Sequence, residues 1–402
     1  MRKYSPREYL MIDMANQYGH GIDKKTFRQR VAWARSLKDP KSKVEKAKKP
    51  YQYMAAVLAI EDVDAGRPIG HLVGLDASAS GISLMGAMMG CRTTAKNCGI
   101  IDNRPSDIYK VLTDTVNELI EDSIDVPRED AKRSLMTFYY GSEAVPKEIF
   151  GEGDDLSAFY EAADIVAPGA GILRDYLLAS WQPGALSHSW DMPDGFHVHI
   201  PVLVKEQSKI EIDELEGHPS IQYAYDINEG TESGLSLIAN ATHSVDGFIV
   251  REITRRCSYD MRKLVSIHSV LKNRKKTSPV AVTDIEKLYR KSGMMSLVAI
   301  ERLTLPLVSL FTESFCAALQ ELVEDVLEYP PFELIQVHDE FKAHPNHVNR
   351  MREVYIGILG EIADADMAKH IIAQIRNDDT FTIEKLSHDL GDMIREGEYS
   401  IS

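Results

Sequence analysis

The sequence predicts an α+β fold that is mostly helical and contains a small antiparallel sheet. Two observations carry this prediction. Apolar residues recur at helical spacing through most of the 402 positions. Short apolar runs at 71–75 and 332–337 instead have the length of strands, and each leads into an aspartate, Asp76 or Asp339. Residues 341–344 have the pattern of a strand that returns beside the second run.

The other elements follow in chain order from local signals. Capping residues, prolines and glycines mark where helices begin and end. The expected helices span 24–35 (basic and amphipathic), 51–60, 80–89, 108–122 behind Asp107, 127–140 before Gly141, and 297–327, long or kinked at Pro306. A turn at Pro193–Gly195 separates two strand-like runs, of which 195–204 is expected to form a hairpin arm.

The composition excludes several classes of protein. With 44% hydrophobic and 27% charged residues, the chain can bury a large core, unlike disordered, collagen-like or mini-protein sequences. No apolar run approaches the roughly 18 residues of a membrane span, and the first residues lack a signal-peptide pattern. We therefore expect a soluble, cytoplasmic protein with no membrane partner. Four cysteines without a CxxC pair predict reduced thiols.

The charge is unevenly distributed along the chain. The formal net charge is −15, yet residues 1–50 carry fourteen Lys and Arg against five Asp and Glu, and residues 251–291 carry twelve against four. Two basic segments on an acidic body are typical of a protein that holds a polyanion in one place. Two solvated helical faces would account for the same charges.

Asp76 and Asp339 are candidate metal ligands. If their strands are neighbours in one sheet, the two carboxylates converge. Paired carboxylates suit two Mg²⁺ ions about 4 Å apart, which can stabilise both oxygens of a phosphoryl displacement. Aspartates also occur at strand ends simply as turn residues, so both interpretations stay open at this point.

The helix that begins at Pro127 has a candidate substrate face. Arg128, Lys132, Met136 and Tyr140 are spaced by four and therefore share one side of the helix. Two cations and an aromatic ring suit the phosphates and the base of a nucleoside triphosphate. A surface helix with a partly buried tyrosine would show the same spacing.

Three strings resemble the motifs of a known family. Residues 76–82 (DASASGI), 128–142 (REDAKRSLMTFYYGS) and 337–340 (VHDE) resemble, in order, motifs A, B and C of the bacteriophage-type single-subunit DNA-directed RNA polymerases. Lesser matches lie in the family's order at 107–109 (DIY), 192–196 (MPDGF), 232–234 (ESG) and 243–247 (HSVDG). With the segments 16–33 and 398–402, the resemblance covers nearly the whole chain.

The resemblance implies a right-hand polymerase fold and a two-metal nucleotidyl transfer that adds NTPs to an RNA 3′ end on a DNA template. It implies palm at 1–103, fingers at 104–243 and palm again at 244–402. It also implies a role for each matching residue. Two Mg²⁺ ions would be bound by Asp76, Asp339 and the carbonyl of Ala77, and the triphosphate by Arg128, Lys132 and Arg133. The 2′-hydroxyl would be sensed by Tyr140 and His243, while Gly81 leaves room for the ribose and Tyr109 and Met136 line the pocket.

The chain departs from the family at its start. Full-length members have several hundred residues before the equivalent of Asn16. Either this chain is a fragment or a second subunit supplies the rest. A chain divided here resembles the large, catalytic subunit of the heterodimeric RNA polymerase of some podophages, which implies the cytoplasm of an infected bacterium.

Three other departures qualify the expected function. An insertion at about 257–325 is expected to contact template, RNA or the partner subunit. Glu340 gives the HDE string of family A DNA polymerases, so a DNA polymerase fragment stays an alternative, as does a non-catalytic, polymerase-shaped assembly protein. The acidic stretch 209–232 replaces a promoter-reading hairpin. We therefore expect no tight duplex recognition without a single-stranded-DNA-binding or other auxiliary protein.

Overall fold

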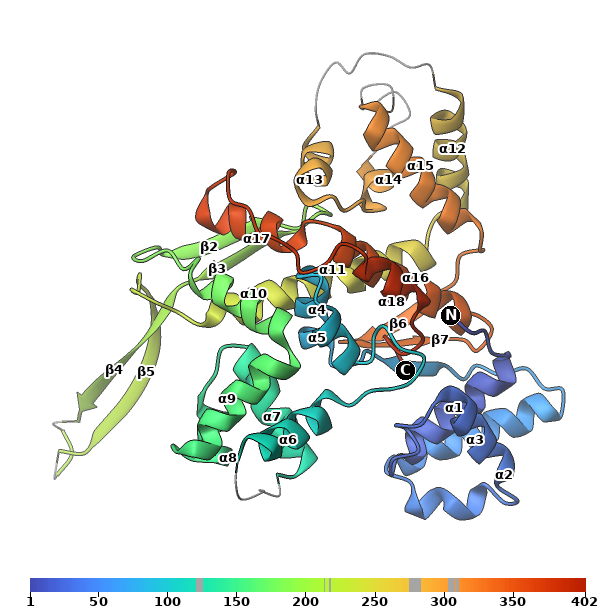
Figure 1. Ribbon diagram of the computed structural model, residues 1–402, viewed down its shortest axis with the longest axis horizontal. Coiled ribbons are helices and arrows are strands. Elements are labelled where there is room, and N and C mark those ends of the chain that lie inside the picture. Colours follow the sequence, from blue (N-terminus) through green and yellow to red (C-terminus); the bar gives the residue numbers. More distant parts are fainter. Residues whose placement is uncertain (121–125, 213, 217, 275–282, 303–307, 309–310) are drawn as a thin grey trace.

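A small antiparallel sheet brings distant parts of the sequence together at the centre of the molecule (Figure 1). In the computed structural model, β1 (Val73–Asp76) pairs with β7 (Glu340–Ala343), and β7 pairs with β6 (Leu334–Val337). The structure describes residues 1–120, 126–212, 214–216, 218–274, 283–302, 308 and 311–402. The expected α+β class with a small antiparallel sheet is confirmed.

The N-terminal helices pack together on one side of this sheet (Figure 1). They are α1 (Pro6–Tyr18), α2 (Phe27–Ser36), the short 3₁₀ helix η1 (Lys41–Lys46) and α3 (Pro50–Asp64). The expected start of the second helix at position 24 is wrong, because Thr26 and Gln29 form a capping box that begins α2 at Phe27. Lys24 therefore lies in the turn before the helix.

A helical region follows β1. It contains α4 (Ser80–Met88), α5 (Arg92–Asn97), α6 (Ile108–Leu119), α7 (Arg128–Tyr139), α8 (Ala144–Phe150), α9 (Asp154–Val166) and α10 (Pro168–Leu178). The buried α4 lies at its centre, and Gly141 has φ +93° directly after α7, which fits a glycine stop. Helix α6 ends at Leu119, so the expected helix to 122 is too long, and 121–125 lie outside the described residues.

Two hairpins replace the single arm that was expected over 195–204. Strand β2 (Ser187–Asp191) pairs with β3 (His197–Pro201) across the predicted turn at Pro193–Gly195. The chain then leaves this pair at Val202, and β4 (Leu203–Glu211) pairs instead with β5 (Ser220–Asn228). This second hairpin is a largely exposed ribbon that projects from the molecule (Figure 1).

A second hydrophobic core lies apart from the main one. Its buried residues fall between Leu264 and Val326, on α12 (Met261–Asn273), α14 (Val298–Arg302) and α15 (Glu313–Leu327) and the chain between them, and α13 (Asp284–Ser292) packs beside them (Figure 1). The single helix expected over 297–327 is wrong, because α15 begins anew at Glu313 after an extended Thr312. Pro306 lies outside the described residues.

Four further helices complete the main core. They are α11 (Ser236–Cys257), α16 (Val348–Asp364), α17 (Met367–Arg376) and α18 (Leu390–Glu396). Within the described ranges, no helix has both the length and the apolar content needed to cross a bilayer. All four cysteines are buried and free of disulfides, as expected of reduced thiols.

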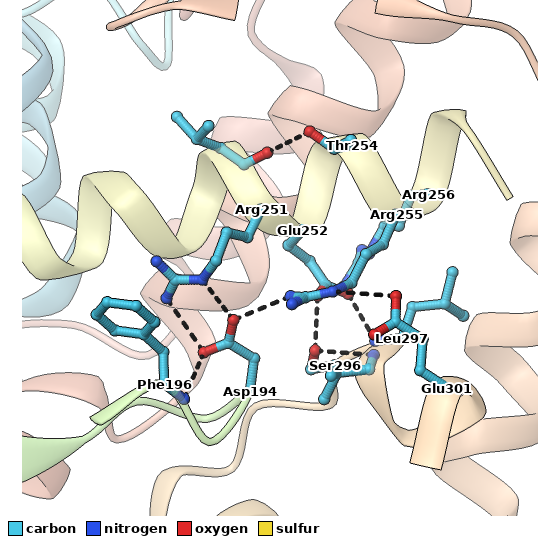
Figure 2. A network of polar contacts seen from close by, with 12 residues as sticks. Asp194, Phe196, Arg251, Glu252, Thr254, Arg255, Arg256, Ser296, Leu297 and Glu301 are labelled. Carbon is cyan, nitrogen blue, oxygen red and sulfur yellow. Dashed lines mark hydrogen bonds and ion pairs between the residues drawn. The ribbon is translucent and has the colours of Figure 1, made fainter. Parts of the chain in front are cut away.

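A buried network of charges joins α11 to its surroundings (Figure 2). Arg251 and Arg255 of α11 bind Asp194 in the turn of the β2–β3 hairpin, with Arg251 Nε at 2.6 Å from Asp194 Oδ2. Glu252 accepts hydrogen bonds from Ser296 and from the Leu297 N–H. The same helix therefore holds both the hairpin and the segment that carries the second core.

Candidate active site

The central sheet places Asp76 and Asp339 close together. Asp76 ends β1, and Asp339 lies in the two-residue turn between β6 and β7. The Ala77 N–H donates a hydrogen bond to the Asp339 carbonyl oxygen at 3.1 Å. The two strands belong to one sheet, as the convergence of the carboxylates requires, although β7 lies between them.

The electrostatics around Asp76 are unbalanced. Burial by the surrounding protein, followed by the charges of Asp339 and Glu340, raises the pKa of Asp76 to about 6. Lys24 and Lys132 oppose this rise only in part. The carboxylate is still accessible from an open cavity, although protein surrounds it on most sides. The cluster therefore carries negative charge that a bound cation would offset.

That cavity has a volume of about 190 Å³ and lies between the sheet edge, α4, α6 and α7. Besides Asp76, Ala77 and Asp339, it is lined by the whole predicted face of α7 and the following residue: Arg128, Lys132, Met136 and Tyr140. Gly81 and Tyr109 line it as well. Three segments that are far apart in sequence thus contribute to a single cavity.

Arg128 is held in place by three neighbours, one of which is Glu129 at 3.2 Å. Its Nε atom donates to Asp107 Oδ2 at 2.5 Å, and its guanidinium carbon lies 5.2 Å from the centre of the Tyr109 ring. Asp107 also caps α6. Lys132, by contrast, has no ion-pair partner among the described residues. One cation of the cavity is therefore pre-positioned, and the other is available to a ligand.

Tyr140 reaches the cavity above Gly81. A Cβ atom at position 81 would overlap the Tyr140 hydroxyl, so the absence of a side chain there makes room for the tyrosine. The Tyr140 ring lies against the His243 ring, with 5.0 Å between their centres. Burial, with smaller contributions from Asp246 and Asp339, raises the pKa of Tyr140 to about 12, so the hydroxyl keeps its proton at neutral pH.

Two predicted residues do not line the cavity. His243 is exposed and meets it only through Tyr140. Arg133 points elsewhere and makes ion pairs with Asp130 at 3.6 Å and Glu148 at 3.8 Å. Its position one residue after Lys132 turns it by about 100° away from the cavity face. Glu340 is ion-paired with Lys342 at 3.1 Å and borders an adjoining cavity.

The sequence analysis did not identify three residues that belong to the site. Lys24, Asp107 and Ser402 all line the cavity. The capping box after Lys24 was the available signal that this lysine precedes the helix. Ser402 is placed by backbone pairing, since its N–H donates to the Asp76 carbonyl oxygen at 2.9 Å. No local sequence pattern predicts a contact between residues so far apart in the chain.

The comparison with protein families gives the general class of the chain. Residues 5–147 match the family model of the DNA-dependent RNA polymerases. The matched segment contains Asp76, Gly81, Tyr109 and all of α7, and it supports a DNA-dependent RNA polymerase, a nucleotidyltransferase of transcription, as the general class. No curated protein matches the chain.

Proposed function

We propose that this chain is the catalytic subunit of a DNA-directed RNA polymerase. One observation carries the proposal: Asp76, the cationic face of α7 and Asp339 come from three distant segments and line one cavity. The family match at residues 5–147 supports it independently. In this assignment the central sheet belongs to the palm, residues 104–243 to the fingers, and 257–325 to an insertion.

The proposed reaction extends RNA by one nucleotide. The 3′-oxygen of the RNA attacks the α-phosphorus of an NTP, a new P–O bond forms, the bond to the β-phosphate oxygen breaks, and pyrophosphate leaves while the hydroxyl proton passes to water. Arg128, Lys132 and Lys24 would hold the triphosphate. Arg128 supports this role because Asp107 and Tyr109 already fix its position, which lowers the cost of ordering it around the substrate.

Tyr140 is the proposed sensor of the sugar. Its protonated hydroxyl borders the cavity beside Gly81, and a 2′-hydroxyl could satisfy it by hydrogen bonding. A deoxyribose would leave that buried polar group unpaired, which disfavours dNTPs. His243, whose ring lies tilted against that of Tyr140, would act by holding Tyr140 in this orientation.

The residues present fit a magnesium site. No group of three or more His, Cys, Asp or Glu side chains suited to a metal occurs among the described residues. Asp76 and Asp339 with the Ala77 carbonyl nevertheless suit Mg²⁺, which is usually held by one or two carboxylates together with water and substrate phosphates. Burial, followed by the charges of Asp339 and Glu340, raises the pKa of Asp76, and a bound cation would favour its ionised form. Two bound Mg²⁺ ions would supply charge stabilisation and a more acidic 3′-hydroxyl.

A second subunit and an auxiliary protein complete the proposal. The proposed second subunit rests on the resemblance to the large subunit of the heterodimeric RNA polymerase of some podophages. Residues 209–232, which include part of the exposed β4–β5 ribbon, carry seven Asp and Glu against one Lys, and carboxylates disfavour tight binding to duplex phosphates. We therefore propose that promoter opening depends on a single-stranded-DNA-binding or other auxiliary protein.

Primer extension tests the proposed function. A preassembled RNA–DNA scaffold is incubated with Mg²⁺ and either NTPs or dNTPs, for the chain alone and for the chain with lysate from its native setting. The proposal expects extension with NTPs when lysate is present, and its loss in Asp339→Asn.

Other outcomes select the alternatives. Extension with dNTPs in preference to NTPs would identify a DNA polymerase of family A type. The feature that favours this alternative is Glu340, the third residue of the HDE string. No extension under either condition would favour a non-catalytic assembly protein. Full extension by the chain alone would contradict the need for a second subunit.

A further inference from the structure

A second cavity, of about 440 Å³, adjoins the candidate active site. One wall comes from the end of α1, the following turn, one residue of α2 and the two residues before α3, and it carries four cations: Lys24, Arg30, Lys48 and Lys49. The other wall is the edge of the central sheet with Asp76, Asp339 and Glu340. The two cavities share Lys24, Asp76 and Asp339, so the carboxylates stand where the two spaces meet.

Two of the four cations are free to bind a ligand. Arg30 is buried and bonded to the Lys25 carbonyl oxygen and to Asn16, so it is committed to the fold. Lys48 and Lys49 are exposed and have no ion-pair partner among the described residues. Lys24 meets Asp23 at 3.4 Å and also borders the nucleotide cavity.

The backbone of this lysine pair is fixed. The N–H groups of Lys48 and Lys49 donate to the carbonyl oxygens of Tyr18 and Gln17, at 3.0 and 3.2 Å. The stem of Lys48 crosses Gly19, which has φ +72° and whose missing side chain leaves the space for it. A long side chain packed along its stem loses less freedom when its ammonium group binds an anion.

The in-line geometry of phosphoryl transfer indicates what enters this second cavity. The attacking and leaving oxygens lie on opposite sides of the phosphorus. If a triphosphate lies against Arg128 and Lys132 in the first cavity, the attacking 3′-oxygen must arrive at Asp76 and Asp339 from the other side. The cavity lined by Lys48 and Lys49 also adjoins these carboxylates and is the space that we assign to the attacking strand.

We propose that Lys48 and Lys49 bind the phosphodiester groups next to the 3′ end of the RNA strand and so position its terminal hydroxyl. The inference rests on the proposed polymerase function and deepens it, because it assigns a strand to a surface outside the nucleotide cavity. Both lysines are positioning residues, since they contact the strand and not the reacting atoms.

The test measures binding separately from chemistry. The Kd of a fluorescent RNA–DNA scaffold is measured by anisotropy over a range of salt concentrations, for the wild type and for Lys48→Gln/Lys49→Gln. The expected result is a Kd raised about tenfold near physiological salt, with a log–log salt slope that is shallower by about 1.5, as the loss of two phosphate contacts predicts. The KM for NTP should stay within about twofold, as expected for phosphate contacts outside the nucleotide cavity.

Uncharged linkages in the nucleic-acid backbone show which strand the two lysines contact. A methylphosphonate in place of one of the last two RNA linkages should weaken binding to the wild type and have little further effect on the double variant. If only neutral linkages in the template strand behaved in this way, the assignment to RNA would be overturned.

A matched variant controls for charge. Lys43→Gln/Lys46→Gln also removes two positive charges, from η1, which lines neither cavity, and it should leave Kd nearly unchanged. Equal effects of the two double variants, or no effect of either while Asp339-dependent extension persists, would overturn the inference and leave the proposed function standing. Absence of Asp339-dependent extension would overturn both.

Discussion

Two acidic clusters in this molecule have opposite electrostatic surroundings. In the network of Figure 2, Asp194 has a side chain that is 1% exposed, and two arginines contact it directly. Burial alone would raise the pKa of Asp194, but the hydrogen bonds and charges of Arg251 and Arg255 outweigh it and lower the pKa. At the sheet edge, burial and then the charges of Asp339 and Glu340 raise the pKa of Asp76 to about 6, and Lys24 and Lys132 offset this rise only in part.

This difference distinguishes charged groups that stabilise the fold from charged groups that are arranged to bind a ligand. A buried carboxylate with matched cations is satisfied within the chain and holds its elements together. A carboxylate cluster without matched cations lowers stability unless something binds there, so it indicates a function more than a structural role. Four predictions test this difference between the two sites.

The largest expected effect follows from Asp339→Asn. Nucleotide incorporation by the assembled enzyme should fall by at least about a hundredfold, because one of two proposed metal-binding carboxylates is lost. The free energy of unfolding should stay the same or rise slightly, because a repulsive charge beside Asp76 disappears. Single-turnover extension and urea denaturation measure the two quantities.

Glu340→Gln is the matched comparison for that prediction. Its carboxylate is already ion-paired with Lys342, so we expect at most about a tenfold loss of rate. Equal losses for the two variants would contradict the distinction drawn here between Asp339 and Glu340.

Asp194→Asn should lower stability and leave catalysis nearly unchanged, which is the opposite of the result expected for Asp339→Asn. It leaves Arg251 and Arg255 facing a neutral group, and breaking such a buried pair costs about 3–5 kcal/mol of stability. Catalytic parameters of the protein that remains folded should change little. Urea denaturation of Asp191→Asn, which alters a half-exposed aspartate in the same hairpin, provides the control and should show less than about 1 kcal/mol.

The contribution of Asp194 should depend on pH with a definite sign. Because its pKa is lowered in the folded state, the stabilisation is fully present above the unfolded pKa of about 4 and is lost as pH falls through the folded value. The stability difference between the wild type and Asp194→Asn should therefore be constant from pH 7 to pH 5 and shrink below pH 4. A difference that already shrinks between pH 7 and pH 5 would contradict the lowered pKa.

The smallest expected effect is that of Tyr140→Phe. The preference for NTPs over dNTPs should fall about tenfold, since the hydroxyl that rewards a 2′-hydroxyl is absent, while the rate with NTPs falls only a few-fold. Competition assays on one scaffold measure the ratio.

The adjacent Tyr139 offers a control for the tyrosine prediction. Its hydroxyl donates to the Ala163 carbonyl oxygen at 2.7 Å, away from the cavity. Tyr139→Phe should reduce stability and leave the nucleotide preference unchanged. An unchanged preference in Tyr140→Phe would remove the proposed sensing role.

Local signals were sufficient for the elements that carry the site. The short apolar runs before Asp76 and Asp339 became β1 and β6, and the Pro127 and Gly141 signals bounded α7 closely. The spacing of four along α7 correctly grouped the residues that face the cavity, although the roles of those residues stay predictions. These successes share a cause, since each depends on a few consecutive residues and a fixed period.

The misses have two causes. Ser402 reaches the site through pairing with Asp76, at the far end of the sequence, a contact that no local pattern contains. The other two are local signals that were not used: Arg133 was included through the family resemblance, although helical geometry turns it away. Lys24 was placed inside a helix because its basic neighbours matched the amphipathic pattern, whereas the Thr26 capping box decided the boundary.

The contact between Gly81 and Tyr140 has a consequence for how this protein can vary. The two positions lie on different helical segments, yet they share one volume, because the tyrosine hydroxyl takes the space that a side chain at 81 would need. A side chain at position 81 therefore meets a penalty that Tyr140 imposes, whereas a smaller residue at position 140 meets none from Gly81. Among homologous chains, a residue larger than glycine at 81 should occur together with a smaller residue at 140, so a directed search for altered sugar preference should randomise the two positions as a pair.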